Sequence, residues 1–267
     1  MSADSQSPAP RFSPSHANRQ FWDSDARDYH AAHEEYLSSF YWCPEMLHEE
    51  QAQLLGDVST STVLELGCGS APCTAWLQGR ARFATGFDIS RGMLTHAPGG
   101  LPLVQADVLA LPYSNDSFDV VFSAFGALPF IANIDQALAE VHRVLKPGGR
   151  FVFSTNHPMR WIFPDDPANL TAELPYFDRA YIESDAEGNL TYAEFHRTVG
   201  DWLRALQTRG GFLIEDILEP EWPEDLDLTW GQWSRERGEI FPGTIILSAS
   251  DNDRSLGQTM ITVWVRQ

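Results

Sequence analysis

Short apolar runs alternate with helical patterns along the middle of the chain. Residues 63–66 and 120–123 have the length and composition of buried strands, and between 134 and 146 the apolar side chains fall at helical spacing. The Pro-Gly-Gly run at 147–149 stops this helix, and another apolar run follows it to 154. Strands that alternate with helices are typical of a parallel sheet with helices on both faces. The pattern therefore predicts an α/β fold.

Three stretches lie outside this alternation of strands and helices: the first twenty residues, the segment that follows them, and a long segment after residue 155. Residues 1–20 are rich in Ser and Pro and lack an apolar run, which predicts a disordered tail and not a secretory signal. Residues 25–37 and 44–55 favour two helices with aromatic flanks. Residues 156–197 are rich in Pro, Asp and aromatic side chains and have little periodicity. A loop of that length is uncommon in a compact domain unless it is functional or forms a subdomain.

The end of the chain supplies the remaining elements of the sheet. Residues 201–207 have a helical pattern, and residues 212–218 form a sixth strand. Two later runs, 244–248 and 260–265, compete for a final antiparallel strand. The predicted organisation has five segments: a tail at 1–20, a helical segment at 21–57, an α/β core at 58–155, an insertion at 156–200, and the rest of the core at 201–267.

Composition narrows the classes of function. The chain has 267 residues and a net charge of −19, from 37 acids against 18 bases, with no basic cluster. Because nucleic-acid binding depends on Lys and Arg neutralising phosphates, a polynucleotide partner is disfavoured. No apolar run approaches the roughly 18 residues of a membrane span. The three cysteines have neither a disulfide framework nor zinc-site spacing, so we expect a cytoplasmic protein without a metal.

A glycine turn after the first strand carries the candidate chemistry. Gly67 and Gly69 permit a turn tight enough to bring bare backbone against a ligand, and Pro72 suits the first position of the following helix. Asp88 ends the next apolar run, where a carboxylate can bind two vicinal ribose hydroxyls. A dinucleotide fingerprint requires a third glycine at the position of Pro72. The pattern therefore indicates a nucleoside site of another kind.

Four passages in the expected order resemble class I S-adenosylmethionine-dependent methyltransferases. Glu65-x-Gly67-x-Gly69 matches the first motif of that family, except that its last glycine is Ala71. Asp107-Val108, the Leu-Pro-Tyr to Phe-Asp passage at 111–119, and the Lys-Pro-Gly-Gly strand at 145–154 follow. The resemblance is strong over about 58–154. It implies a Rossmann-like core at 58–155 and 201–267, whose seven-stranded, mostly parallel sheet has a final antiparallel strand. It also implies an N-terminal helical lid at 21–57 and an insertion after the fifth strand, at 156–200, that caps the acceptor site.

The resemblance also implies a cofactor site for S-adenosylmethionine at the carboxyl ends of the strands. Its expected residues are Tyr29 at the methionine carboxylate, Glu65 at the amino group, Gly67, Cys68 and Gly69 as close backbone, Asp88 at the ribose, Asp107 and Val108 at the adenine, Ile89 and Met93 on the adenine face, and Ser123 at the end of the fourth strand. Met93 is equally consistent with plain core packing.

Methyl transfer from a sulfonium is an in-line displacement that requires alignment, exclusion of water and, for some acceptors, removal of a proton. His157 follows the fifth strand and His196 opens the later helix, so both are candidate bases, although a structural role is open for each. We expect a small-molecule acceptor between His157, the insertion and the N-terminal helices. The alternatives are a quinone-like lipid precursor, a tRNA base, or a cofactor-binding protein without catalysis. The oligomeric state stays open.

Overall fold

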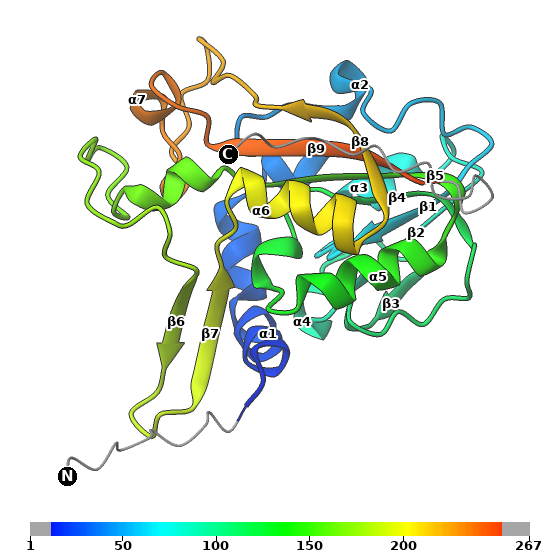
Figure 1. Cartoon of the computed structure of the whole chain (residues 1–267), viewed down its shortest axis with the longest axis horizontal. Coiled ribbons are helices and arrows are strands. Elements are labelled where there is room, and N and C mark those ends of the chain that lie inside the picture. The colour runs from blue at the N-terminus through cyan, green and yellow to red at the C-terminus, as the bar shows by residue number, and fades with distance from the viewer. Residues whose placement is uncertain (1–11, 253–267) are drawn as a thin grey trace.

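The computed structural model describes residues 12–252 and has a seven-stranded sheet at its centre (Figure 1). Its strands, in the order β3-β2-β1-β4-β5-β9-β8, are β3 (Leu103–Gln105), β2 (Phe83–Asp88), β1 (Thr62–Leu66), β4 (Phe118–Ser123), β5 (Leu145–Asn156), β9 (Thr244–Asp251) and β8 (Phe212–Leu218). All neighbours pair in parallel except those of β9, which is antiparallel to both. The predicted α/β sheet with an antiparallel final strand is confirmed. The competing run at 260–265 lies outside the described residues.

Helices cover both faces of the sheet because successive side chains of a buried strand point to opposite faces. One core contains Leu64 of β1 and the inner sides of α5 and α6, whereas Val63, the preceding residue, belongs to a second core with Leu77 of α3. The bounds are α3 (Pro72–Leu77), α4 (Arg91–Leu94), α5 (Ile134–Val144), α6 (Val199–Arg204) with a π turn at Ala205–Arg209, and α7 (Arg235–Gly238). Helix α5 ends at Val144, three residues before Pro147. Strand β5 begins at Leu145, so the Pro-Gly-Gly run lies within this strand.

The N-terminal region differs from the prediction. A helix, α1 (Pro14–Ala32), begins inside the stretch expected to be a disordered tail, so that expectation is wrong for residues 14–20. The reason is local: the Oγ of Ser13 accepts the His16 N–H as an N-cap, and Pro14 occupies the first turn. Residues 1–11 lie outside the described part.

The second helix of the expected lid is also shorter than predicted. Between residues 33 and 57, the helical segments are a 3-10 turn at Tyr36–Ser38 and α2 (Glu49–Ala52). The buried Glu49 carboxylate accepts hydrogen bonds from the Trp42 indole at 2.8 Å and from the backbone of Leu55 at 2.9 Å. These side-chain contacts hold the chain in an irregular path that an amphipathic pattern does not reveal.

The insertion after β5 has secondary structure of its own. It contains a 3-10 turn at Pro158–Ile162 and an antiparallel hairpin of β6 (Ala180–Ser184) and β7 (Leu190–Phe195), which projects from the body beside α1 (Figure 1). The amide of Asn18 in α1 donates to the Ala193 carbonyl at 2.8 Å, and its oxygen accepts the Ala193 N–H at 2.9 Å. The buried Asn18 thus joins α1 to β7 in the way a neighbouring strand would.

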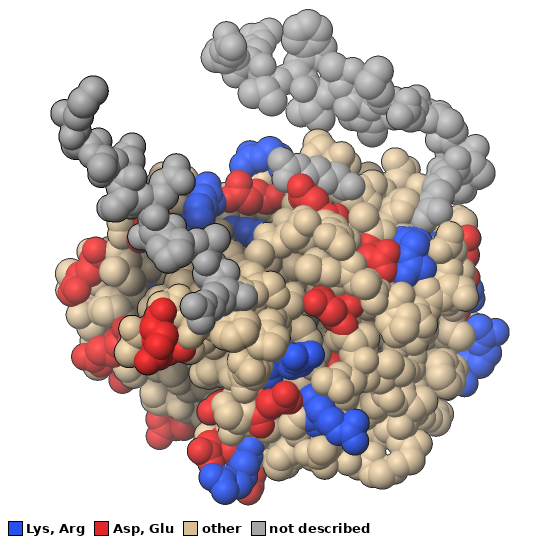
Figure 2. All heavy atoms as spheres, turned by 90° about the horizontal axis from the view of Figure 1, so that it is seen from below, with Lys and Arg blue, Asp and Glu red and all other residues tan. Residues whose placement is uncertain are grey.

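On the face shown in Figure 2, acidic and basic side chains are interspersed among uncharged ones. Within residues 12–252, none of the helices has both the length and the apolar content needed to cross a bilayer.

Candidate functional site

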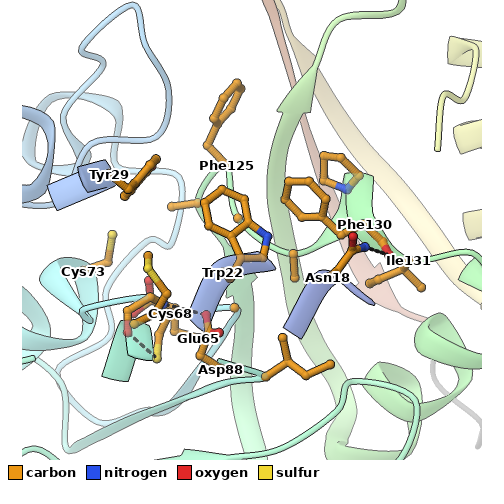
Figure 3. A pocket seen from close by; sticks show the side chains of 18 of the residues that line it. Asn18, Trp22, Tyr29, Glu65, Cys68, Cys73, Asp88, Phe125, Phe130 and Ile131 are labelled. Carbon is orange, nitrogen blue, oxygen red and sulfur yellow. Dashed lines mark hydrogen bonds between the residues drawn. The ribbon is translucent and has the colours of Figure 1, made fainter. Parts of the chain in front are cut away.

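A cavity of about 370 Å³ lies at the carboxyl ends of β1, β2 and β4. The glycine turn and the ends of these strands line one side, and side chains from α1, the insertion and the 230–233 loop line the other. Figure 3 shows Trp22 of α1 in the middle of the view, with Glu65 and Asp88 to one side and Phe130 to the other. Parallel sheets bind ligands at this edge.

The turn after β1 has the close approach that its glycines predict. Gly67 has φ +63°, and a Cβ on it would lie 2.7 Å from the Cβ of Ala127. Gly69 has φ +55°. Ala71, at the position of the missing third glycine, keeps the left-handed path with φ +59° as the residue before α3. A left-handed conformation costs a residue with a Cβ roughly 1–2 kcal/mol relative to glycine, and Ala71 adopts it here.

Glu65 is a buried carboxylate at the cavity wall. Its Oε2 accepts hydrogen bonds from the backbone N–H of Thr74 at 2.9 Å and from the Thr74 hydroxyl at 2.5 Å. Burial raises the pKa of Glu65 to about 7, partly offset by the bonds from Thr74. A bound cation in the cavity would favour the ionised form.

Asp88, at the end of β2, accepts hydrogen bonds from the glycine turn and from the loop that follows β2. One oxygen accepts the Gly69 N–H at 2.8 Å and the other accepts the Ser90 N–H at 2.8 Å. Burial raises the pKa of Asp88 to about 6 despite these bonds. Further along the wall, Asp107 accepts the N–H of Leu109 at 2.9 Å, which fixes the loop after β3. Three carboxylates thus surround this end of the cavity.

α1 is fastened above the same end. The Asp23 carboxylate accepts hydrogen bonds from the Ser90 hydroxyl at 2.7 Å and from the Gly92 N–H at 2.8 Å. Tyr29, two turns later, lines the cavity, and burial raises the pKa of its hydroxyl, which therefore stays protonated.

Most of the predicted cofactor residues lie together. Ten of them line the cavity: Tyr29, Glu65, Gly67, Cys68, Gly69, Asp88, Ile89, Met93, Asp107 and Val108. Ser123 does not; it is fully buried, and its hydroxyl donates to the Leu66 carbonyl at 3.0 Å between two paired strands.

The two candidate bases are not at the cavity wall, which corrects the expectation that His157 lies at the reaction centre. His157 caps the 3-10 turn: its Nδ1 accepts the Met159 N–H at 3.1 Å, so Nε2 donates to Glu219 at 2.9 Å. His196 stacks on Trp161 with ring centroids 3.5 Å apart, and burial together with the charge of Arg160 lowers its pKa to about 4. A position after a strand end did not determine where these rings point.

The sequence reasoning missed a polar group at the far end of the cavity. Asn156, Arg160, Tyr192 and Glu194 line it there. Glu194 is 8% exposed and accepts hydrogen bonds from the Asn156 amide at 2.9 Å and from the Tyr192 hydroxyl at 3.2 Å. These residues come from both ends of the insertion, which the hairpin brings together, and no sequence spacing links them.

Aromatic side chains line the space between the two ends. They are Trp22, Phe125, Phe130, Trp230 and Trp233. Trp22 meets Phe130 edge to face with centroids 5.3 Å apart, and Phe125 meets Trp233 at 5.2 Å. The many aromatic residues of the sequence, Trp22, Trp230 and Trp233 among them, predict such a chamber, and these three line it. The cavity thus joins an acidic end to an aromatic chamber.

Comparison with known proteins supports the resemblance to methyltransferases that the sequence motifs indicate. Residues 64–153 match the family described as "Methyltransferase domain". The structure resembles that of a Listeria monocytogenes protein described as an S-adenosylmethionine-dependent methyltransferase, with a TM-score of 0.62 and 27% identity over 77% of this chain and 96% of that one. Residues 64–153 are thus a domain of the class I S-adenosylmethionine-dependent methyltransferase type. S-adenosylmethionine is the cofactor of this family.

The curated relatives align with only part of this chain. A malonyl-[acyl-carrier protein] O-methyltransferase of Methylococcus capsulatus is 40% identical over 35% of this chain and 36% of its own length. A demethylmenaquinone methyltransferase of Staphylococcus epidermidis is 37% identical over 48% of this chain and 57% of its own length. The alignments thus cover about a third to somewhat more than half of these relatives.

Proposed function

We propose that the protein binds S-adenosylmethionine at the acidic end of the cavity and transfers its methyl group to a small molecule in the aromatic chamber. The observation that carries this proposal is the continuity of the two regions: Glu65, Asp88 and the aromatic side chains line one cavity. An acceptor in the chamber therefore faces a cofactor in the turn without an intervening wall.

The residues at the acidic end match the charges of the cofactor. Glu65 faces the methionine amino group, a cation, while Asp88 accepts from the ribose hydroxyls and Asp107 from the adenine amino group. Gly67 and Gly69 allow close backbone approach, and the hydroxyl of Tyr29 donates to the methionine carboxylate. Cofactor binding places the positively charged methionine amino group beside the buried Glu65 carboxylate, and this attraction offsets the cost of ionising the carboxylate.

The reaction is an in-line displacement in which the acceptor atom bonds to the methyl carbon as the carbon–sulfur bond breaks. The sulfonium is already electrophilic, so the protein contributes alignment and a chamber without bulk water. Trp22 and Phe130 form the walls of this chamber. The structure places no histidine there, so the proposal includes no histidine base.

A small-molecule acceptor fits the chamber better than a polynucleotide does. The net charge of −19 and the absence of a basic cluster in the sequence oppose nucleic-acid binding. The relatives described above act, by their names, on malonyl-[acyl-carrier protein] and on demethylmenaquinone. A quinone-like lipid precursor is itself the kind of acceptor that one of these relatives methylates by name, whereas nothing favours a tRNA base. A cytoplasmic location is part of the proposal, and cell fractionation tests it.

The test is methyl transfer with methyl-labelled S-adenosylmethionine and the small-molecule fraction of a cell extract. Wild type should produce a labelled small molecule. Asp88→Ala should reduce labelling at limiting cofactor, and Asp57→Ala, a change at an exposed carboxylate, should not. Tight binding of S-adenosylhomocysteine with no labelled product in any fraction would favour a cofactor-binding protein without catalysis.

A further inference from the structure

One arginine lines the cavity, and part of its guanidinium group has no hydrogen-bond partner among the described residues. Arg160, in the 3-10 turn after β5, lines the cavity. Its Nε and Nη1 are buried from solvent and have no hydrogen-bond partner among the described residues. Together these two atoms carry three of the five N–H donors of the side chain.

Two indoles hold the guanidinium in place. The Cζ of Arg160 lies 4.2 Å from the ring centroid of Trp161 and 4.0 Å from that of Trp233. Cation–π contacts orient the group, but a ring face does not replace an acceptor in the plane of the N–H bonds. Buried cations are normally paired, because desolvation without a partner is costly. Three donors of Arg160 therefore lack the acceptor that a ligand of the cavity could supply.

The neighbouring carboxylate does not serve as that partner. Glu194 attracts Arg160 at a distance, but no ion pair within 4 Å joins them, and both Glu194 oxygens already accept bonds from Asn156 and Tyr192. Asp165, which also acts on Arg160 through its charge, accepts a hydrogen bond from the Gln232 amide. Acidic groups near the guanidinium disfavour a ligand with more than one negative charge.

We propose that the acceptor of this enzyme is a flat, apolar carboxylic acid whose carboxylate binds Arg160. The proposal rests on the proposed function, since it names the class of molecule in the chamber. A carboxylate is planar and singly charged, and it accepts two parallel N–H bonds from one guanidinium. The rings of Trp22, Phe130 and Trp233 then contact the body of the acid. Arg160 is thus a specificity-determining residue and takes no part in the bond changes.

Calorimetry with matched pairs of probes tests this proposal. The probes are benzoic and cinnamic acids that carry a hydroxyl or amino group, each paired with its primary amide, titrated with and without S-adenosylhomocysteine. At least one acid should bind wild type roughly 10–100-fold more tightly than its amide, which corresponds to a hydrogen-bonded charge pair. Arg160→Gln should abolish this preference and leave the affinity for S-adenosylhomocysteine unchanged. Arg179→Gln, an exposed arginine of the insertion outside the cavity, should retain the preference.

Thermal unfolding shows whether loss of binding reflects loss of the fold. Arg160→Met replaces the unpaired cation by an apolar side chain, so the free variant should melt no lower than wild type, but acids should no longer raise its melting temperature. Equal binding of acids and amides, no binding of any acid, or a preference that survives Arg160→Gln would overturn the inference. Failure of S-adenosylhomocysteine to bind wild type would instead overturn the proposed function.

Discussion

Replacement of Glu65 by Gln should stabilise the free protein at high pH and weaken its cofactor binding. Glu65 is 3% exposed, and its pKa is raised by burial from 4.5 to about 7. Since one pKa unit corresponds to about 1.4 kcal/mol, burial disfavours the ionised carboxylate by roughly 3 kcal/mol. Gln has nearly the same shape and can still accept from Thr74, but it does not ionise.

The direction of the pH dependence follows from proton linkage. Between pH 4.5 and about 7 the folded protein holds a proton on Glu65 that the unfolded chain has lost, so stability falls as the pH rises. At pH 5 the variant and wild type should have similar free energies of unfolding. At pH 8 the variant should be more stable by up to about 3 kcal/mol. Urea denaturation of the cofactor-free proteins at both pH values measures this difference.

The same substitution should weaken cofactor binding although it stabilises the free protein at pH 8. The variant has lost the charge that faces the methionine amino group, so its affinity for S-adenosylhomocysteine at pH 8 should fall by about 1.5–3 kcal/mol in calorimetry. The exposed Glu50 provides the control, and Glu50→Gln should change neither property. A Glu65→Gln variant that is no more stable than wild type at pH 8, or that binds cofactor as tightly, would refute the assignment of Glu65 as a buried ionised partner.

Two further substitutions and one binding measurement test the glycine turn, the N-terminal helix and the class of acceptor. Gly67→Ala should lower the melting temperature more than Gly79→Ala does, because both have positive φ but only Gly67 would place its Cβ 2.7 Å from Ala127. Equal effects in calorimetric scans would contradict that packing. Asn18→Ala should increase hydrogen exchange in α1 and β7, where Asn18 bonds Ala193; unchanged exchange would show that the helix is held elsewhere. tRNA and DNA should not bind at physiological salt, and micromolar binding with a steep salt dependence would contradict the exclusion of polynucleotides.

The cofactor half could be predicted from the sequence because its determinants are local. Gly67 and Gly69 form a turn that few other residues permit, and Asp88 ends the adjacent strand, so the parallel pairing of β1 and β2 brings these residues together. The bounds of β8 (Phe212–Leu218) also agree with the pattern, and Ile134 begins α5 as expected. In each case a short segment contains both the signal and its partner.

The acceptor half could not be predicted in the same way. Arg160 and Glu194 line the same cavity only because a hairpin folds back beside α1, and that packing includes the hydrogen bonds of Asn18 with Ala193, 175 residues later. His157 has the position of a catalytic residue, but Met159 and Glu219 occupy both of its ring nitrogens. Side-chain direction after a strand end is set by such tertiary contacts. The same is true of α1, whose first turns gain stability from burial of Asn18 against the hairpin.

The most direct test of the account is a calorimetric titration of the purified protein at pH 8 with S-adenosylhomocysteine, with NAD as the competing nucleotide. The account predicts saturable, one-to-one binding of S-adenosylhomocysteine, no measurable binding of NAD, and an affinity for S-adenosylhomocysteine that decreases as the pH falls through 7 and 6, where Glu65 and Asp88 take up protons. Absence of S-adenosylhomocysteine binding, or tighter binding of NAD, would contradict it.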